Sequence, residues 1–448
     1  MALVYPFRAY RYNPAVAPFE RVLTQPYDKI SPAMQDKYYA ADPHNLIAIE
    51  KGRTHSGDTP QHNVYTRAAA SLKEWMAQSV VQQDAVPSFY AYTQEYDVPG
   101  TSLRRTRRGF IGLGKLEEYA AGVIFRHEHT LSGPKADRLE LLRHTRMHTG
   151  QLFMLYSDPQ LRIDQILTEG GSAHPRVTQM TDEYGVIHRL WPVSESGRIV
   201  AIQEAMADQK LVIADGHHRY ETSLNFRNES RTRAGKVIPD APYERSMMTF
   251  INTRSEGLTI LPTHRVVANL RDFSWSALRT YLEPWFSTEV FSFANERERH
   301  LAADRFLSYL SAHKDRRAIG VYPTAERSAR AFCVLMLRPE TDIAQILPGL
   351  SPLQGKLDVV LLHQGILEPV LGITPHAVAS EANLTYEREA SAALDAVERG
   401  VAQIAFLLNP ADVDLVMEVA TAGEVMPQKS TDFYPKLLSG ITMYRVEE

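Results

Sequence analysis

LVIADGHHRYET, residues 211–222, is the stretch of this chain that most constrains its fold. Its first four residues form a short apolar run that predicts a strand, and the residues after Gly216 are typical of a helix. A strand that passes through Asp215 and Gly216 into a helix points backbone N–H groups, two imidazoles and a guanidinium at one small volume. Because a helix N-terminus carries unpaired donors and partial positive charge, that volume suits an anion, above all a phosphate.

Each polar residue of this turn has a chemical interpretation. Gly216 lets the backbone approach a ligand closely, and Arg219 can bind two phosphate oxygens at once. Asp215 adds one carboxylate, which can hold a cation or take a proton. The alternative is a purely structural strand-to-helix turn with surface histidines, in which Tyr220 and Leu224 anchor the helix on the core.

The overall composition describes an ordinary globular enzyme. The chain has 448 residues, 44% of them hydrophobic and 23% charged, so two or three domains are expected. A net charge of −4 and a pI near 6.5 do not favour broad electrostatic binding to nucleic acid. With Cys333 as the single cysteine, an intrachain disulfide and a cysteine-rich zinc site are both excluded. The first residues lack a signal-peptide pattern and no apolar run is long enough for a membrane span, so we expect a cytoplasmic protein with no membrane partner.

Alternating helix and strand signals predict a mixed α/β (α+β) fold. We expect strands over residues 46–49, 88–93, 106–113, 151–156, 187–191, 211–214, 247–252, 317–322, 331–337 and 402–408. We expect helices over residues 68–80, 139–147, 275–286, 296–313, 387–400 and 413–422. Helical patterns lengthen after about residue 268, so we divide the chain into domains 1–267 and 268–448. No Gly/Ser linker marks that boundary, which predicts that the two parts pack together.

A second polar group precedes the phosphate-type turn in sequence. If residues 126–130 are extended, His127 and His129 point to one face and Glu128 to the other. A His-x-His pair can bind a metal, but no third ligand follows at a diagnostic spacing, so we assign no metal site. Lining of an active site and a solvated strand end are the remaining alternatives. Lys135 and Arg138 follow closely and would add positive charge near a phosphate.

Three further segments have both a structural and a functional interpretation. Residues 23–30 contain Pro26-Tyr27-Asp28, which either caps a following helix through Asp28 or presents Tyr27 and Asp28 to a ligand. Residues 104–108 are the one basic run, and a hairpin arm with solvated arginines is favoured over a contact to nucleic acid or nucleotide phosphates. Residues 426–436 are polar and turn-like yet contain two aromatics and two lysines, so they form either a surface loop or a tail that returns to the active site.

Taken together, these motifs resemble the bacterial and archaeal domain-of-unknown-function 1015 family. The resemblance rests on residues 25–28, 127–130 with 135–138, 214–222, 261–265 and 426–436, which run along nearly the whole chain. The Asp-Gly-His-His-Arg element is also similar to the phosphate-binding turn of the ParB/sulfiredoxin superfamily, whose free-serine kinases are closest in chemistry. That resemblance implies a ParB/sulfiredoxin-like catalytic domain over residues 1–267. The arginine-rich DNA-binding helices of ParB have no clear counterpart here.

The resemblance also implies roles for individual residues. Gly216, His217, His218 and Arg219, with Lys135 and Arg138, would hold nucleotide phosphates, and Asp215 would contact a metal or the substrate hydroxyl. The serine kinases use an upstream glutamate as base, for which Glu128 is our candidate and Asp28 the alternative. We assign Tyr27, His127, His264 and Lys429 to substrate binding.

These assignments predict a phosphotransferase or phosphohydrolase. Its substrate would be a small hydroxylated or phosphorylated metabolite, with serine or phosphoserine as examples, and its cofactors a nucleotide (ATP or ADP) and Mg²⁺. The alternative is a nucleotide-binding regulatory protein without small-molecule catalysis. A nucleic-acid protein that uses residues 104–108 ranks last because of the acidic net charge.

Overall fold

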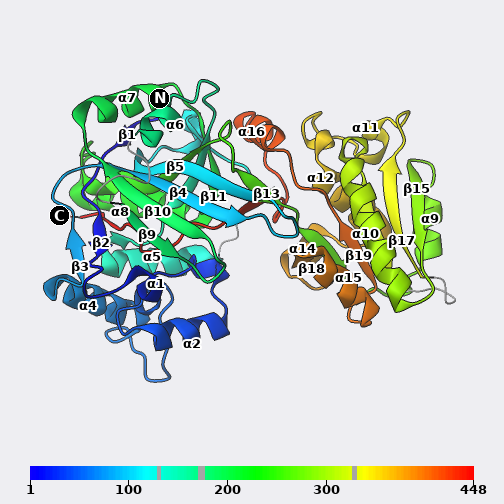
Figure 1. Cartoon of the computed structure of the whole chain (residues 1–448), viewed down its shortest axis with the longest axis horizontal. Coiled ribbons are helices and arrows are strands. Elements are labelled where there is room, and N and C mark those ends of the chain that lie inside the picture. Colours follow the sequence, from blue (N-terminus) through cyan, green and yellow to red (C-terminus); the bar gives the residue numbers. More distant parts are fainter. Residues whose placement is uncertain (129–132, 170–176, 325–329, 448) are drawn as a thin grey trace. The chain divides into compact units, whose positions relative to one another are not determined.

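The computed structural model describes residues 1–128, 133–169, 177–324 and 330–447, and among them it has two compact units (Figure 1). Unit 1 contains residues 1–259 and the last segment, 433–448, whereas unit 2 contains residues 260–432. Our sequence boundary near residue 268 placed the whole C-terminal part in one domain. The chain instead crosses between the units twice, at β13 (Thr259–Leu261) and β20 (Asp432–Tyr434). Both units combine helices with sheets, which confirms the mixed α/β class.

Unit 1 is built on one large, mostly antiparallel sheet. Among the described residues it has nine strands, in the order β6-β11-β8-β12-β5-β4-β10-β9 with β1 also paired to β5. The strands of unit 1 are β1 (Val4–Tyr5), β2 (Tyr10–Tyr12), β3 (Val81–Gln83), β4 (Phe89–Asp97), β5 (Arg104–Lys115), β6 (Ile124–Arg126), β7 (Met147–His148), β8 (Leu152–Tyr156), β9 (Thr178–Thr181), β10 (Ile187–Val193), β11 (Leu211–Asp215), β12 (Arg245–Asn252) and β21 (Tyr444–Arg445). Two pairs, β11–β6 and β12–β8, are parallel, so the sheet is mixed at the edge that carries β11.

Helices and short helical turns surround this sheet. They are α1 (Phe19–Val22), η1 (Tyr27–Lys29), α2 (Pro32–Ala41), α3 (Ile47–Glu50), α4 (Val64–Ala77), η2 (Tyr119–Ala121), α5 (Gly133–Thr145), α6 (Arg162–Thr168), α7 (Ser196–Ala207), α8 (His217–Ala234) and η3 (Pro242–Glu244). Side chains alternate between the two faces of each strand, as the pleat requires. One face of the sheet supplies the apolar core, in which Phe110 and Phe250 pack with Ile163 of α6 and Ile202 of α7.

The opposite face of the same sheet is polar and is contacted by the returning C-terminal segment. Gln94 and Arg107 lie on this face, with Phe153 beside them. Residues 433–443, here called the C-terminal strap, run through unit 1 (Figure 1) and place the ring of Phe433 at 5.5 Å from that of Phe153. Polar side chains of this face thus find hydrogen-bond acceptors in a distant part of the chain.

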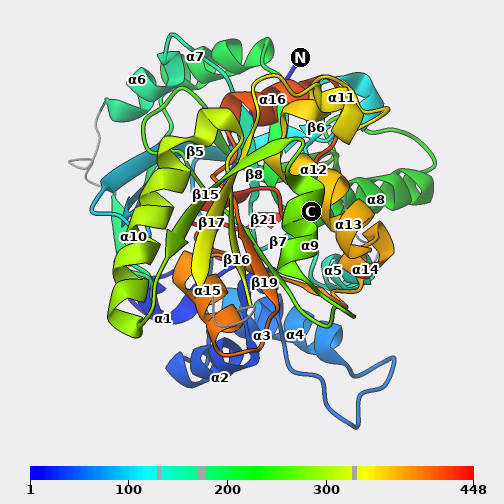
Figure 2. The ribbon, with the colours of Figure 1, turned by 90° about the vertical axis from the view of Figure 1, so that its right-hand side faces the viewer.

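Unit 2 has a six-stranded antiparallel sheet among its described residues, in the order β15-β17-β16-β19-β14-β18. Helices α10 and α15 contact this sheet and form its apolar core with it (Figure 2). The elements are β14 (His264–Val267), α9 (Trp275–Leu282), β15 (Phe286–Ser292), α10 (Glu296–Ala312), η4 (Lys314–Arg316), β16 (Ile319–Pro323), β17 (Ala331–Leu337), α11 (Ile343–Ile346), η5 (Gln354–Lys356), α12 (Asp358–Leu362), the π-helical η6 (His363–Leu367), α13 (Glu368–Leu371), α14 (Pro375–Ala379), β18 (Leu384–Glu387), α15 (Ala390–Glu398), β19 (Ile404–Leu407) and α16 (Val413–Thr421).

Most predicted elements are present, and one was wrong in type. The strand expected over residues 46–49 is helix α3, because the Asn45 side chain accepts a hydrogen bond from the Ile47 amide at 2.9 Å and starts a helical turn. A short apolar run does not distinguish a buried helix from a strand by its pattern. The predicted helix 139–147 begins earlier, at Gly133, and ends before β7. The helix predicted over residues 275–286 ends at Leu282, and Phe286, the last residue of the predicted range, is the first residue of β15.

Among the described residues, no helix has the combination of length and apolar composition that crossing a membrane requires.

Candidate phosphate-binding site

The turn between β11 and α8, residues 214–219, is here called the Gly216 turn. Gly216 precedes the 18-residue helix α8 with φ of +95°, a conformation that favours glycine, and as a glycine it has no side chain to cap that helix. The pairing of β11 with β8 shifts by one residue between Ile213 and Asp215. Such a bulge re-aims the side chains next to it. The turn therefore sets Asp215 beside the first N–H groups of α8, which have no partner within the helix itself.

Two cations from different parts of unit 1 meet on Asp215. The Nζ of Lys436 lies 2.8 Å from Asp215 Oδ2, and Arg219 Nη2 lies 3.3 Å from Oδ1. Burial would raise the pKa of the Asp215 carboxyl, but Lys436 and Arg219 hold it well below its usual range. Lys29 and Arg107 also act on this carboxylate electrostatically. Asp215 thus lies among four cations and contacts two of them, Arg219 and Lys436, while Asp28 and Glu50 also act on Arg219.

Arg219 is fixed from both ends of its guanidinium. Its Nη1 donates to the Gln151 carbonyl and its Nη2 to Asp215. Burial lowers the pKa of Arg219, but Asp215 and Asp28 overcome this and raise it. A Cβ at Gly216 would lie 3.1 Å from the guanidinium carbon of Arg219, so the glycine and the arginine occupy touching positions. The guanidinium is charged and held against the backbone of the turn.

The predicted histidines pack together on the other side of the turn. The Nδ1 of His127 donates to the Ile213 carbonyl at 2.6 Å. The rings of His127 and His217 are 4.9 Å apart, and Glu128 Oε1 lies 3.6 Å from His127 Nε2. Within the described residues, the buried Nε2 of His217 has no hydrogen-bond partner. Burial, with a further effect of His127, lowers the pKa of His217 to about 3, so its ring is neutral near pH 7.

A group of residues from the N-terminal part and α5 lies on the far side of Arg219. Arg138 donates to the Glu50 carbonyl oxygen at 2.7 Å and stacks its guanidinium 4.3 Å from the centre of the Tyr27 ring. The Glu50 carboxylate is buried and accepts hydrogen bonds from Thr149 Oγ1 and Ser439 Oγ. Arg219 interacts electrostatically with Glu50 and with Tyr27. The buried Glu50 carboxylate therefore lies close enough to Arg219, the predicted phosphate-binding arginine, to act on its charge.

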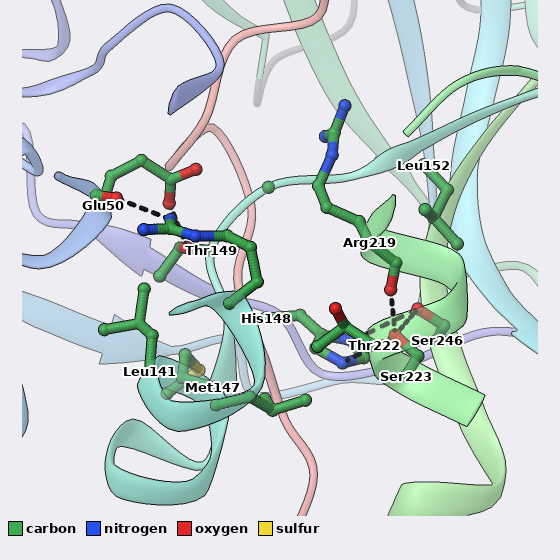
Figure 3. A pocket seen from close by; sticks show the side chains of 13 residues that line it. Glu50, Leu141, Met147, His148, Thr149, Leu152, Arg219, Thr222, Ser223 and Ser246 are labelled. Atoms are coloured by element: carbon green, nitrogen blue, oxygen red, sulfur yellow. Dashed lines mark hydrogen bonds between the residues drawn. The ribbon is translucent and has the colours of Figure 1, made fainter. Parts of the chain in front are cut away.

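A small cavity of about 50 Å³ lies beside Arg219, Glu50 and Arg138, and Figure 3 shows its lining. Its walls are formed by Glu50, Arg138, Leu141, Leu142, Met147, His148, Thr149, Gly150, Leu152, Arg219, Thr222, Ser223 and Ser246. Glu50 and Thr149 lie toward one end, and His148, Ser223 and Ser246 toward the other (Figure 3). The buried Oγ1 of Thr222 has no partner within the described residues. The cavity has room for a few water molecules or a small polar group.

Gly150 keeps this cavity open where its polar groups converge. A Cβ at position 150 would lie 3.1 Å from Ser439 Oγ, 3.3 Å from Arg219 Nη1 and 3.7 Å from Glu50 Oε1. These three groups therefore surround one point. At the other end, the hydroxyls of Ser223 and Ser246 each lie 3.4 Å from a ring nitrogen of His148. Burial lowers the pKa of His148 to about 4, so this end is uncharged near pH 7.

The C-terminal strap is held in place by side chains of the polar sheet face. Arg107 is buried and donates to the carbonyls of Tyr434 and Pro435 at 3.2 and 2.5 Å. Gln94 Nε2 donates to the carbonyl of Lys436 at 2.8 Å. The expected solvated hairpin arm over residues 104–108 fits Arg104, which pairs with Glu95, but it is wrong for Arg107. Arg107 is buried with its hydrogen bonds going to these carbonyls and to Gln94 Oε1 on the neighbouring strand.

Most of the residues predicted from the sequence lie near one another in unit 1. Those with a described side chain cluster at the site or on its borders: Tyr27, Asp28, His127, Glu128, Arg138, Asp215, Gly216, His217, His218 and Arg219. Asp28 is exposed in η1, and Ser31 rather than Asp28 caps helix α2. Lys135 is in the first turn of α5, but its side chain lies outside the described part, as do residues 129 and 130.

Two predicted substrate residues belong to unit 2. His264 is buried in β14 and its Nδ1 accepts a hydrogen bond from the Leu408 amide at 3.3 Å. Lys429 is exposed, and its carbonyl accepts a hydrogen bond from Arg265. Their relation to the Gly216 turn remains a prediction from the sequence.

Sequence reasoning missed Glu50 and Lys436. Glu50 was hidden by the wrong strand assignment over residues 46–49, whereas Lys436 lay in the polar segment 426–436 but Lys429 was selected instead. The aromatic and lysine content of that segment was the signal that it returns to unit 1. Within the described residues, no group of three or more His, Cys, Asp or Glu side chains is arranged to hold a metal ion.

Comparison with known proteins identifies one family model, described as a protein of unknown function (DUF1015), which matches residues 4–360. No curated protein matches this chain. Similar solved structures include a conserved hypothetical protein from Pyrococcus furiosus (13% identity, 69% of this chain and 87% of that one, TM-score 0.30). Another similar structure is a free serine kinase variant in complex with ADP (10% identity, 75% of this chain and 90% of that one, TM-score 0.34). A third is C-terminally truncated SbnI from Staphylococcus aureus (12% identity, 73% of this chain and 85% of that one, TM-score 0.33).

Proposed function

This chain belongs to the DUF1015 family, and from its site we propose that it transfers a phosphoryl group between a nucleotide and a small hydroxylated or phosphorylated metabolite. The observation that carries the proposal is the meeting of two cations, Arg219 and Lys436, on one carboxylate at the start of helix α8. Phosphoryl transfer depends mainly on positioning and on neutralising charge, so it needs such a cluster more than it needs covalent chemistry.

The residues of the turn have distinct roles in this proposal. Arg219 and the N–H groups at the start of α8 bind phosphate oxygens, because both are donors with positive charge or partial charge. His217 and His218 line the same turn, and neutral His217 contributes a hydrogen bond rather than a charge. Lys135 and Arg138 are further cations on α5, assigned from the sequence. We also propose, from the turn sequence, that this unit is of the ParB/sulfiredoxin type.

A Mg²⁺ ion fits the donor set only in part. Asp215 is the one carboxylate of the turn itself, and Lys436 and Arg219 already contact both its oxygens. Mg²⁺ is commonly held by one or two carboxylates together with substrate phosphates and water. Asp215 would thus be a single protein ligand, and the nucleotide would supply the others. When bound, the ion would neutralise charge on the phosphate chain.

The base that accepts the proton of the substrate hydroxyl is one of three carboxylates. Glu128 and Asp28 are the candidates from the sequence, and Glu50 is the candidate from the structure. Glu50 lines the cavity beside Arg219, whereas Asp28 is exposed and Glu128 lies against His127. We favour Glu50, because a general base must lie within hydrogen-bond reach of the hydroxyl that it deprotonates.

The cavity next to Glu50 supports a small acceptor. Its volume of about 50 Å³ admits one polar end of a small substrate, and Arg138 and the hydroxyls of Ser223 and Ser246 offer donors for a carboxylate or a phosphate. A hydroxy acid the size of serine, or its phosphate ester, has these groups. We therefore propose serine or phosphoserine as the first substrates to assay.

The test is turnover of ATP and ADP with Mg²⁺, with and without serine, for the wild type and for Arg219→Met. Removing one key phosphate donor should lower kcat by about 10²- to 10³-fold. Arg233→Met, at the exposed C-terminal end of the same helix, is the matched control and should turn over normally. Undiminished turnover in Arg219→Met would refute the phosphate role of the turn. Nucleotide binding without acceptor-dependent turnover would instead support a regulatory protein.

A further inference from the structure

Lys436 reaches the Gly216 turn from the C-terminal strap. It is 221 residues from Asp215 in sequence, and its side chain is only 12% exposed. The residues around it are fixed through their backbone: Arg107 donates to the carbonyl of Pro435, Gln94 to that of Lys436 itself, and Gln151 to that of Leu438 at 3.0 Å. The backbone at Lys436 is therefore fixed, and a lysine has a flexible four-carbon stem through which its ammonium group can change partners.

Stability alone is a weak reason for this arrangement. A single ion pair adds only modestly to stability, whereas a fully buried arginine such as Arg107, whose hydrogen bonds go to carbonyl and amide oxygens, is costly to desolvate. The fold nonetheless uses Arg107 to fix the carbonyls next to Lys436. The arrangement makes sense if the position of Lys436 matters for something other than the pair itself.

The charges around Asp215 indicate what that purpose is. Arg219 and Lys436 both contact this one carboxylate, so the two cations together carry one more charge than the carboxylate that they share. An anion beside these two side chains would be attracted by both cations, although Asp28 and Glu50 also act on Arg219. An oxygen-rich anion such as a phosphate chain has enough acceptor sites for both side chains and for the amides of α8.

We propose that Lys436 is a phosphate-binding residue that is held by Asp215 in the free protein and turns to the phosphate chain when a nucleotide binds. This inference rests on the proposed function. When the Lys436 side chain turns to the phosphate chain, Asp215 Oδ2 loses its hydrogen bond from Nζ. This oxygen can then contact Mg²⁺ or the acceptor hydroxyl. One ion pair thus keeps both groups in place before the substrate arrives.

The test measures binding of pyrophosphate and ADP by calorimetry without Mg²⁺. Lys436→Met should weaken both at least tenfold, and Lys436→Arg should keep affinity within a few-fold of the wild type. Asp215→Asn should tighten pyrophosphate binding several-fold, because the amide no longer competes for Lys436. The double variant Asp215→Asn/Lys436→Met should lose that gain. Lys73→Met, on the exposed face of α4, is the control and should bind normally.

A purely structural ion pair gives the opposite pattern. It predicts that Asp215→Asn and Lys436→Met destabilise the protein alike and that neither the loss nor the gain of affinity occurs. Wild-type affinity in folded Lys436→Met, with binding lost in Arg219→Met, would overturn the role of Lys436 alone. A wild type that binds neither pyrophosphate nor ADP would overturn the proposed function as well. Thermal unfolding of each variant establishes that it is folded, and Lys436→Arg covers the case in which Lys436→Met is not.

Discussion

Replacing Gly216 by alanine separates the backbone role of this glycine from its role in placing Arg219. The φ of +95° at position 216 is strained for any residue with a Cβ, at a cost of about 1–3 kcal/mol. The new Cβ would also lie 3.1 Å from three atoms of the Arg219 guanidinium, which must move by a few tenths of an ångström. Gly216→Ala should therefore lose both stability and phosphate affinity.

Gly235 provides a matched control at the other end of α8. Its φ is +67°, and a Cβ there would have no heavy atom within 4 Å. Gly235→Ala should lose about 1–2 kcal/mol from backbone strain, with unchanged binding of ADP. Gly216→Ala should lose a comparable amount and, in addition, one charge-assisted hydrogen bond of about 1.5–3 kcal/mol, which weakens ADP binding by about 10- to 100-fold.

Urea unfolding and calorimetric titration with ADP measure the two quantities. Two results would refute a role for Arg219 placement: equal ADP affinity in Gly216→Ala and Gly235→Ala, or a loss of affinity in both variants that follows their lost stability. Either result would mean that the position of Arg219 relative to the turn backbone has no part in binding.

Three further outcomes are expected. Glu50→Gln should lower kcat by about 10²- to 10⁴-fold while ADP affinity in calorimetry stays near that of the wild type; equal turnover would point to Glu128 or Asp28. Arg107→Met should lower the free energy of unfolding in urea by about 3 kcal/mol, because the strap carbonyls lose their donor, and it should weaken pyrophosphate binding through Lys436. The free energy of unfolding should fall as the pH drops below about 6.5, because His217 is protonated in the unfolded state whereas its folded pKa of about 3 keeps the ring neutral. The expected loss of stability from this one group is about 2 kcal/mol at pH 5. His217→Asn should show a correspondingly flatter stability profile between pH 7 and 5, and an unchanged slope would contradict the burial of that ring.

The strand and helix pattern of the chain was largely accessible from the sequence, because most strands are apolar or alternating runs between turn residues. The strand over residues 331–337 has the predicted bounds. Residues 46–49 failed because four apolar residues fit a helical turn as well as a strand, and the Asn45 side chain decided between them.

The site was accessible only where its residues are neighbours in sequence. The Gly216 turn holds its glycine, histidines and arginine within four positions. Lys436 and Glu50 reach Arg219 and Asp215 through long-range packing, for which a single sequence gives no register. The burial of Arg107 was equally inaccessible. Two of its acceptors are backbone carbonyls 327 and 328 residues away, and every residue carries such a carbonyl.

A crystal structure of the protein grown with ADP would test the phosphate site most directly. We predict that phosphate oxygens of ADP lie within about 3 Å of Arg219 and of the first amides of α8, with Lys436 turned from Asp215 toward them. Ordered ADP at another place in unit 1, with Arg219 and Lys436 still paired to Asp215, would contradict it.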